Sequence, residues 1–178
     1  MKNMKGVIVF KGRYGATAQY ANWLGSILQL PVYETDELSN GKLNGFDYVI
    51  AGTSVYVGKM LLAKWINSHQ KILAGKKLFM FVVCATPSTE ETQLADQLKK
   101  NINPGLLKTT RVFYLRGRMI KSNLSFVDRL VLRMGAALQK NKSDKERMLT
   151  DFDDVRQENL TEILNAVQSF PFEIREPV

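Results

Sequence analysis

The sequence predicts an α/β protein built on an open parallel sheet with helices on both faces. Short, β-branched apolar segments alternate along the chain with segments of helical periodicity. The segment 77–84 is apolar almost throughout, as expected of a strand that is buried on both faces. Five such strands joined by helices require crossover connections, and these connections make the strands parallel.

The first strand is predicted over residues 7–10. It runs through a loop with two glycines into a helix over 17–30, whose inner face carries Tyr20 and Leu24. Pro31 ends this helix, and a short second strand follows at 32–34. The later elements are a third strand at 47–54, a helix at 59–70, a fourth strand at 77–84, a helix from a capping signal at Ser88 to near Pro104, and a fifth strand at 111–117.

Two helical stretches follow the fifth strand, although one helix is enough to complete such a sheet. The stretch 151–170 is the expected closing helix, with Thr150 and Asp153 as a capping box. The stretch 124–140 is additional. Its apolar stripe consists of Leu124, Val127, Val131, Met134 and Leu138, broadened by Phe126, Leu130 and Leu132. Three interpretations stay open: a helix packed on the core, a basic amphipathic helix at an anionic membrane surface, or a docking face for an acidic protein.

Length and composition indicate one soluble domain over 1–178, because 45% of the residues are hydrophobic and 24% are charged. No apolar run is long enough to span a membrane, and the N-terminus leads directly into a strand rather than a signal peptide. Cys84 is the single cysteine, which excludes an internal disulfide and fits a reducing cytoplasm. His69 is the single histidine, so we expect no metal site.

The chain is basic, with 25 Lys and Arg against 17 Asp and Glu, a net charge of +8. Much of the excess lies in residues 116–147, where nine cations and three acids give +6. An acidic partner is therefore expected at this segment. Nucleic acid is not the expected partner, because the basic stretch has few interleaved aromatic residues and no known binding module.

The loop after the first strand has the composition of a phosphate cradle. Its glycines allow several N–H groups to converge, and the following helix adds the positive end of its dipole. The candidate binding residues are Lys11, Gly12, Arg13, Tyr14, Gly15, Ala16 and Thr17. An ordinary strand-to-helix turn is the alternative. The spacing matches neither the dinucleotide fingerprint nor the Walker loop.

Two further loops follow the third and fourth strands, and they are suited to enclosing a flat aromatic ring. Because the strands are parallel, these loops lie at the same edge of the sheet as the first. Their candidate residues are Thr53, Ser54, Val55, Tyr56, Val57 and Gly58, and then Cys84, Ala85, Thr86 and Pro87. Tyr56 either stacks on the ring or is a partly buried core residue, and Cys84 is expected to be a small buried residue without a redox role.

The pattern Phe10-x-x-x-x-Gly15-x-Thr17-x-x-x-Ala21 resembles the FMN phosphate loop of flavodoxins. This resemblance implies a flavodoxin-like three-layer sandwich with a five-stranded parallel sheet of order 2-1-3-4-5, FMN as the cofactor, and an extra helical segment at about 118–147. Gly12 departs from the pattern, because flavodoxins usually have a hydroxyl residue there. Arg13 is expected to offset the lost donor.

The extra segment resembles the menaquinone-dependent protoporphyrinogen oxidases, the flavodoxin-like branch of that activity. The similarity lies in 117–134 and 143–152, and in the first two loops. It implies an FMN-dependent oxidoreductase of heme biosynthesis that passes electrons from a reduced substrate to a quinone. The cations expected to contact substrate or membrane are Arg116, Arg118, Lys121, Arg129 and Arg133.

Three departures bear on this second resemblance. Tyr14 stands where the family tends to have Asp, Gly12 where it tends to have a hydroxyl, and Tyr56-Val57 where it tends to have Arg-Tyr. No catalytic acid or base is identified. Two other functions stay open: a soluble electron carrier between redox proteins, and a binding module that has lost FMN. The expected location is the cytoplasm, with peripheral contact at the inner face of the cell membrane as a variant.

Overall fold

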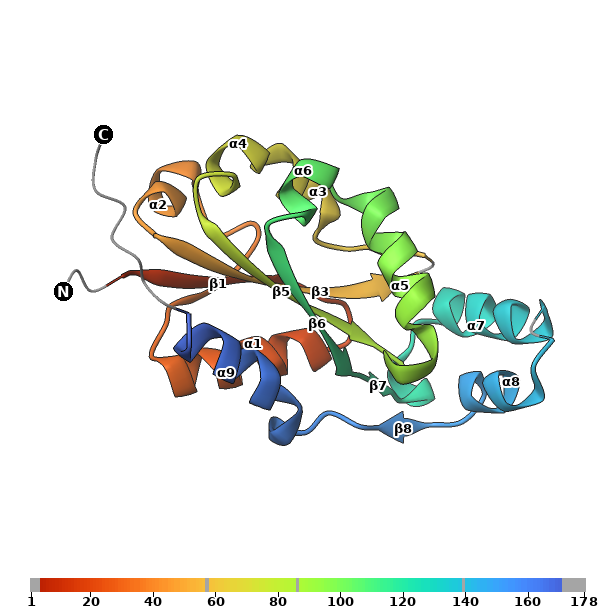
Figure 1. Cartoon of the computed structure of the whole chain (residues 1–178). Coiled ribbons are helices and arrows are strands. Elements are labelled where there is room, and N and C mark those ends of the chain that lie inside the picture. Colours follow the sequence, from red (N-terminus) through yellow and green to blue (C-terminus); the bar gives the residue numbers. More distant parts are fainter. Residues whose placement is uncertain (1–3, 57, 86, 139, 171–178) are drawn as a thin grey trace.

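A twisted parallel sheet forms the centre of the protein in the computed structural model, which describes residues 4–170 except 57, 86 and 139. Its parallel strands are β1 (Gly6–Lys11), β2 (Val32–Glu34), β3 (Tyr48–Tyr56), β5 (Lys77–Cys84) and β6 (Thr110–Arg116). They lie in the order β2-β1-β3-β5-β6 (Figure 1). Counted by parallel strands alone, this is the predicted order 2-1-3-4-5, and the predicted fold class is confirmed.

Helices cover both faces of the sheet and give three layers (Figure 1). On one face lie α1 (Ala16–Leu28) and α9 (Thr161–Gln168). On the other lie α2 (Asn40–Asn44), α3 (Ala63–Ser68), α4 (Gln70–Leu73), α5 (Pro87–Asn101) and α6 (Pro104–Leu107). The predicted first helix is confirmed, and Gln29, with a φ of 54°, ends it just before Pro31.

Side chains alternate along each strand between two apolar cores, as the pleat requires. In β5, Phe79 and Phe81 pack toward α1 and α9, whereas Met80 and Val82 pack toward the opposite helices. Gly52 in β3 is needed for this packing, because a Cβ there would lie 2.2 Å from the ring of Phe81. The cores fix the carboxyl ends of the strands relative to one another, and these ends carry the three predicted loops.

The second of these loops is a hairpin, which the sequence did not predict. Strand β3 continues to Tyr56, and β4 (Lys59–Met60) returns antiparallel to it. Gly58 lies between them with a φ of 71°, a left-handed conformation that glycine adopts without strain. The predicted helix over 59–70 is therefore wrong in its first residues: α3 begins at Ala63 and α4 follows it.

A long excursion follows β6 before the chain returns to the sheet. Its elements are β7 (Arg118–Met119), the 3-10 turn η1 (Lys121–Asn123), α7 (Phe126–Leu138), α8 (Lys142–Met148), β8 (Phe152–Asp153) and the 3-10 turn η2 (Gln157–Leu160). Strand β8 pairs antiparallel with β7. The predicted helix over 151–170 is therefore wrong before Thr161. Thr150 forms no capping box either, because its hydroxyl donates to the carbonyl of Glu146.

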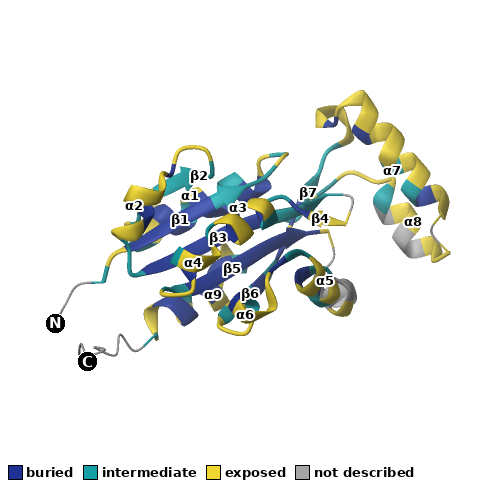
Figure 2. Ribbon diagram, turned by 90° about the horizontal axis from the view of Figure 1, so that it is seen from above, coloured by how far each residue is buried: buried dark blue, intermediate teal, exposed yellow. Residues whose placement is uncertain are grey.

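Helices α7 and α8 stand off from the sheet beyond its carboxyl edge (Figure 2). The outer face of α7 is apolar and exposed: Phe126 is 77% accessible and Leu138 is 83% accessible. The interpretation of this segment as a helix packed on the core is therefore wrong. No helix within the described ranges is long and apolar enough to cross a membrane.

Candidate functional site

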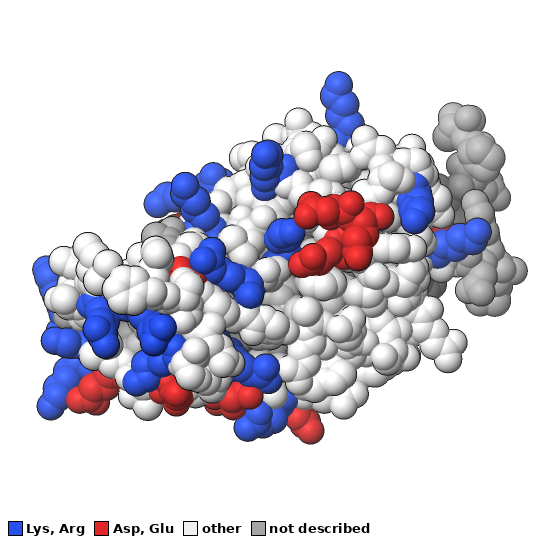
Figure 3. All heavy atoms as spheres, turned by 180° about the vertical axis from the view of Figure 1, so that it is seen from behind, with Lys and Arg blue, Asp and Glu red and all other residues white. Residues whose placement is uncertain are grey.

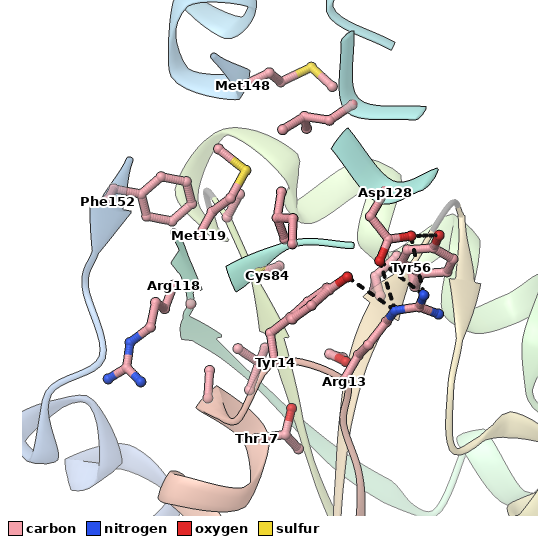
Figure 4. A pocket seen from close by; sticks show the side chains of 18 of the residues that line it. Arg13, Tyr14, Thr17, Tyr56, Cys84, Arg118, Met119, Asp128, Met148 and Phe152 are labelled. Carbon is pink, nitrogen blue, oxygen red and sulfur yellow. Dashed lines mark hydrogen bonds and ion pairs between the residues drawn. The ribbon is translucent and has the colours of Figure 1, made fainter. Parts of the chain in front are cut away.

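A cavity of about 410 Å³ opens at the carboxyl edge of the sheet, between the predicted loops and the excursion (Figure 4). Most of its lining is apolar. The lining residues are Arg13, Tyr14, Ala16, Thr17, Ser54, Val55, Tyr56, Val83, Cys84, Ala85, Gly117, Arg118, Met119, Leu124, Asp128, Val131, Leu132, Gly135, Met148 and Phe152. A volume in the range of roughly 300–1,000 Å³ is typical of small-molecule sites.

One end of the cavity is the start of α1, which presents unpaired donors. Gly15 precedes the helix with a φ of 83°, and no side chain caps the first turn. Thr17 is only 2% exposed, and its hydroxyl faces the cavity (Figure 4). No residue within the described part of the chain is hydrogen-bonded to this hydroxyl. A buried hydroxyl beside free N–H groups at a helix N-terminus is suited to holding an anion.

The glycine at position 12 has a steric reason. A Cβ there would lie 2.7 Å from the Cβ of Thr17 and 2.8 Å from its hydroxyl oxygen. The hydroxyl residue that flavodoxins usually carry at this position is therefore incompatible with the present placement of Thr17. The loop keeps one hydroxyl, that of Thr17, close to the helix start.

Arg13 crosses from the first loop to α7. Its guanidinium donates from Nε to Oδ2 of Asp128 at 3.1 Å and from Nη2 to Oδ1 at 3.2 Å. The Tyr56 hydroxyl donates to the same carboxylate, and the guanidinium carbon lies 4.4 Å from the centre of the Tyr56 ring. The carboxylate is buried, with a side-chain exposure of 4% against 43% for Arg13. One acidic group thus joins the first loop, the second loop and the extra helix (Figure 4).

The apolar part of the cavity is lined by the second and third loops and is covered by side chains of the excursion, which we call the roof. Val55 and Tyr56 from the second loop and Cys84 and Ala85 from the third loop line this part of the cavity. The roof comes from the excursion and consists of Met119, Leu124, Val131, Leu132, Met148 and Phe152. A planar apolar group that enters the cavity meets apolar side chains from the second loop, the third loop and the excursion.

Ten of the residues predicted for the site line the cavity: Arg13, Tyr14, Ala16, Thr17, Ser54, Val55, Tyr56, Cys84, Ala85 and Arg118. Lys11 does not, because it pairs with Asp36 at 3.2 Å beside β2. Thr53 is fully buried, and its hydroxyl accepts from the backbone N–H of Leu62 at 3.1 Å. Gly12, Gly15 and Gly58 shape the turns. Val57, Thr86 and the side chain of Pro87 lie outside the described residues.

The five predicted contact cations do not converge on the cavity. Arg118 lies at the cavity edge and pairs with Asp153 at 2.7 Å and with Gln19 at 2.8 Å. Lys121 pairs with Asp151 at 3.8 Å outside the cavity. Arg116, Arg129 and Arg133 are exposed and do not line it. The structure therefore brings one of the five to the cavity.

Sequence reasoning missed the roof and Asp128. Phe152 and Met148 could not be predicted as site residues, because their positions at the cavity depend on segments distant in sequence. Asp128 left a signal: it is an acid on the inner side of a helix in a strongly basic segment. Among the residues that the structure describes, no group of His, Cys, Asp and Glu is arranged to hold a metal ion.

Comparison of this chain with known protein families and solved structures gives a family match. A family model described as a flavodoxin domain matches residues 7–146. A flavodoxin from Streptococcus pneumoniae TIGR4 has 16% identity and a TM-score of 0.42, over 75% of this chain and 99% of its own. The Trp repressor binding protein from Bacillus subtilis has 13% identity and a TM-score of 0.44, over 77% of this chain and 100% of its own. No curated protein matches the sequence.

Proposed function

The chain belongs to the flavodoxin domain family, and we propose that it is an FMN-dependent oxidoreductase that passes electrons from a reduced organic substrate to a quinone. The observation that carries this proposal is the roofed apolar cavity beside the uncapped start of α1. The enzyme differs in this respect from a carrier that exchanges electrons between proteins. A carrier needs an accessible ring edge, whereas a roof serves to enclose a small molecule.

The residues present fit FMN. Its phosphate suits the first turn of α1, where the Thr17 hydroxyl and the free N–H groups are donors. Its ring suits the apolar part of the cavity, which Val55, Tyr56, Cys84 and Ala85 line. Bound there, FMN supplies reversible electron and hydride transfer, and the protein supplies position and environment.

The chain's own groups set that environment. The Tyr56 ring is fixed by the Arg13 guanidinium above it and by the bond from its hydroxyl to Asp128. The apolar side chains that the excursion contributes to the cavity lower its local polarity, which strengthens electrostatic interactions there. Arg118 lies at the cavity edge, where its guanidinium donates to Asp153 and Gln19 and is directed away from the cavity centre (Figure 4).

A porphyrinogen, the substrate class indicated by the sequence resemblance, is the donor to test first. It is a large apolar ring with carboxylate arms, which agrees with an apolar cavity bordered by Arg118. A menaquinone analogue is the matching acceptor. We expect the purified protein to bind FMN and to couple oxidation of protoporphyrinogen to reduction of this analogue.

The Thr17 hydroxyl provides a specific test of the cofactor site. A hydrogen bond to a charged group contributes about 1.5–3 kcal/mol, so Thr17→Val is expected to weaken FMN binding about 10- to 150-fold. Thr17→Ser keeps the hydroxyl and serves as the matched control, with affinity close to that of the wild type. Fluorescence titration with FMN measures both.

Each remaining alternative has its own outcome in these assays. A protein that takes up no FMN in the titration is a binding module, and the proposal fails. A protein that binds FMN and exchanges single electrons quickly with redox proteins, but shows no quinone reduction, is an electron carrier. The proposal then fails for the reaction and holds for the cofactor.

A further inference from the structure

The exposed apolar side chains of the protein are concentrated on one helix. Among the described residues, eight large hydrophobic side chains are exposed, and six of them belong to α7. These six are Phe126, Val127, Leu130, Val131, Met134 and Leu138, of which Val131 also lines the cavity. Single exposed hydrophobic residues are normal on a protein surface, but a contiguous group of this kind marks an interaction site.

One side of α7 faces the cavity and the other faces solvent. Asp128, Leu132 and Gly135 face the cavity, and Ala136 is buried. On the opposite side, Phe126, Leu130 and Met134 follow one another at intervals of four residues, so they form one continuous row. Because the bonds of Asp128 to Arg13 and Tyr56 hold the inner side in place, the row is presented outward. Figure 2 shows α7 as an exposed helix at the end of the molecule.

Cations border this apolar row. Arg129 and Arg133 are four residues apart on the flank of α7, and both are exposed. Lys140, Lys142 and Lys145 continue the cations into α8, where Lys142 also pairs with Glu146 at 4.0 Å. Figure 3 shows lysine and arginine side chains gathered over the end of the molecule that carries these helices, with acidic side chains along its lower border. The one acid of α7, Asp128, is buried and does not neutralise this surface.

We propose that this outer face of α7 docks on an anionic lipid bilayer, with the helix lying in the plane of the interface. A helix with a wide apolar face, bordered by cations and too short to span, inserts its apolar side chains at the boundary of headgroups and acyl chains. The bordering arginines then meet the lipid phosphates. The charge complementarity selects this occupant: it requires a surface that is acidic and apolar within one helix width, which an anionic bilayer provides.

Docking in this way places the cavity directly behind the bilayer surface. Val131, Leu132 and Gly135 line the cavity from the inner side of the helix whose outer side meets the lipid. The cavity is thus separated from the lipid by one helix, a thickness of about 10 Å. This consequence rests on the proposed function: a quinone dissolved in the membrane has a short path to the cavity along the edge of α7. The docking itself does not depend on it.

Vesicle partitioning of the full-length protein tests the docking. The wild type is expected to co-sediment at low salt with vesicles that contain phosphatidylglycerol, and not with vesicles of phosphatidylcholine alone. At about 1 kcal/mol for each cation near the surface, R129Q/R133Q lowers the partition coefficient about 30-fold. F126S/L138S lowers partitioning with the charge unchanged. The control K64Q/K71Q makes the same charge change on α3 and α4, far from α7 (Figure 1), and keeps most of the binding.

Three outcomes overturn the proposal. The first is a wild type that does not co-sediment with anionic vesicles, and the second is an R129Q/R133Q variant that partitions like the wild type. The third is a concentration-dependent dimer, seen by sedimentation, that F126S/L138S abolishes. The last outcome assigns the face to a second copy of the chain. FMN titration of the same samples separates the two proposals, because a wild type that binds FMN but not the anionic vesicles refutes only the docking.

Discussion

The carboxylate of Asp128 attaches α7 to the body of the protein, and removing this carboxylate tests how strongly α7 is held there. It accepts three side-chain bonds, two from Arg13 and one from Tyr56. Asp128→Ala removes all three acceptor contacts at once. Besides Asp128, only Ala136 is buried among the described side chains of α7, so few apolar contacts remain to replace them. We therefore expect α7 to open locally while the sheet remains folded.

The expected loss of free energy in Asp128→Ala follows from the burial of the Arg13–Asp128 ion pair. Removing one partner of a fully buried ion pair costs about 3–5 kcal/mol. The Arg13 side chain is 43% exposed and regains water when the carboxylate is lost, which reduces the cost. We expect the opening free energy of α7 to fall by about 2–3 kcal/mol, and its amides to exchange about 30- to 150-fold faster. Asp128→Asn keeps the shape and part of the bonding, and is expected to lie between this variant and the wild type.

Hydrogen exchange measured by mass spectrometry distinguishes this local effect from general destabilisation. Peptides from α7 and α8 are expected to exchange faster in Asp128→Ala, and peptides from β3 and β5 to remain unchanged. The control is Asp36→Ala, which removes the exposed Lys11–Asp36 pair of 3.2 Å beside β2. Unchanged α7 exchange in Asp128→Ala would refute the reasoning. So would equal acceleration in Asp36→Ala, because the effect would then be one of net charge.

Two further substitutions test the core beside the site. Tyr20→Phe removes a hydroxyl that donates to the carbonyl of Arg116 at 2.7 Å and accepts from Asn159 at 2.6 Å, and urea unfolding is expected to show a loss of about 1–3 kcal/mol. Burial raises the pKa of Tyr20 above its ordinary value, so wild-type stability falls as pH rises above about 10, and this fall is expected to be shallower in the variant. Gly52→Ala drives a methyl group into the Phe81 ring and is expected to cost about 1–3 kcal/mol, which Phe81→Leu partly restores. A Gly52→Ala protein with wild-type stability would contradict the close contact.

The sheet could be predicted from the sequence because its signals are local. The apolar run 77–84 and the helical pattern after Gly15 each depend on residues near in sequence. The crossover rule then places the three loops at one edge without further information. For the same reason, the two walls of the cavity and the start of α1 were predicted.

The errors arise where distant segments determine local structure. Phe152 and Val155 are spaced like the inner face of a helix, which favoured the long closing helix. In the folded chain, Phe152 lines the cavity and its strand pairs with Arg118 and Met119, more than thirty residues earlier. The salt bridge from Arg118 to Asp153 fixes that pairing. No local pattern in the sequence contains this contact.

Arg13 shows how a missed long-range contact changes the interpretation of a correctly predicted loop. Sequence reasoning assigned its charge to the phosphate, as compensation for Gly12. In the structure, two of its donors are bonded to Asp128, and its guanidinium lies over Tyr56. The anion site at α1 therefore depends on neutral donors, chiefly the Thr17 hydroxyl and the backbone.

This arrangement couples the two ends of the candidate site. Gly12 and Thr17 are in contact, so the loop has no room for a second hydroxyl. The charge next to that loop is used to hold α7, and α7 both closes the cavity and presents the apolar row. Because Arg13 bonds to Asp128 and not to a ligand, the same contact positions the inner side of α7 at the cavity and its apolar row toward solvent. A substitution at Asp128 is therefore expected to affect both, whereas one at Thr17 affects the anion site alone.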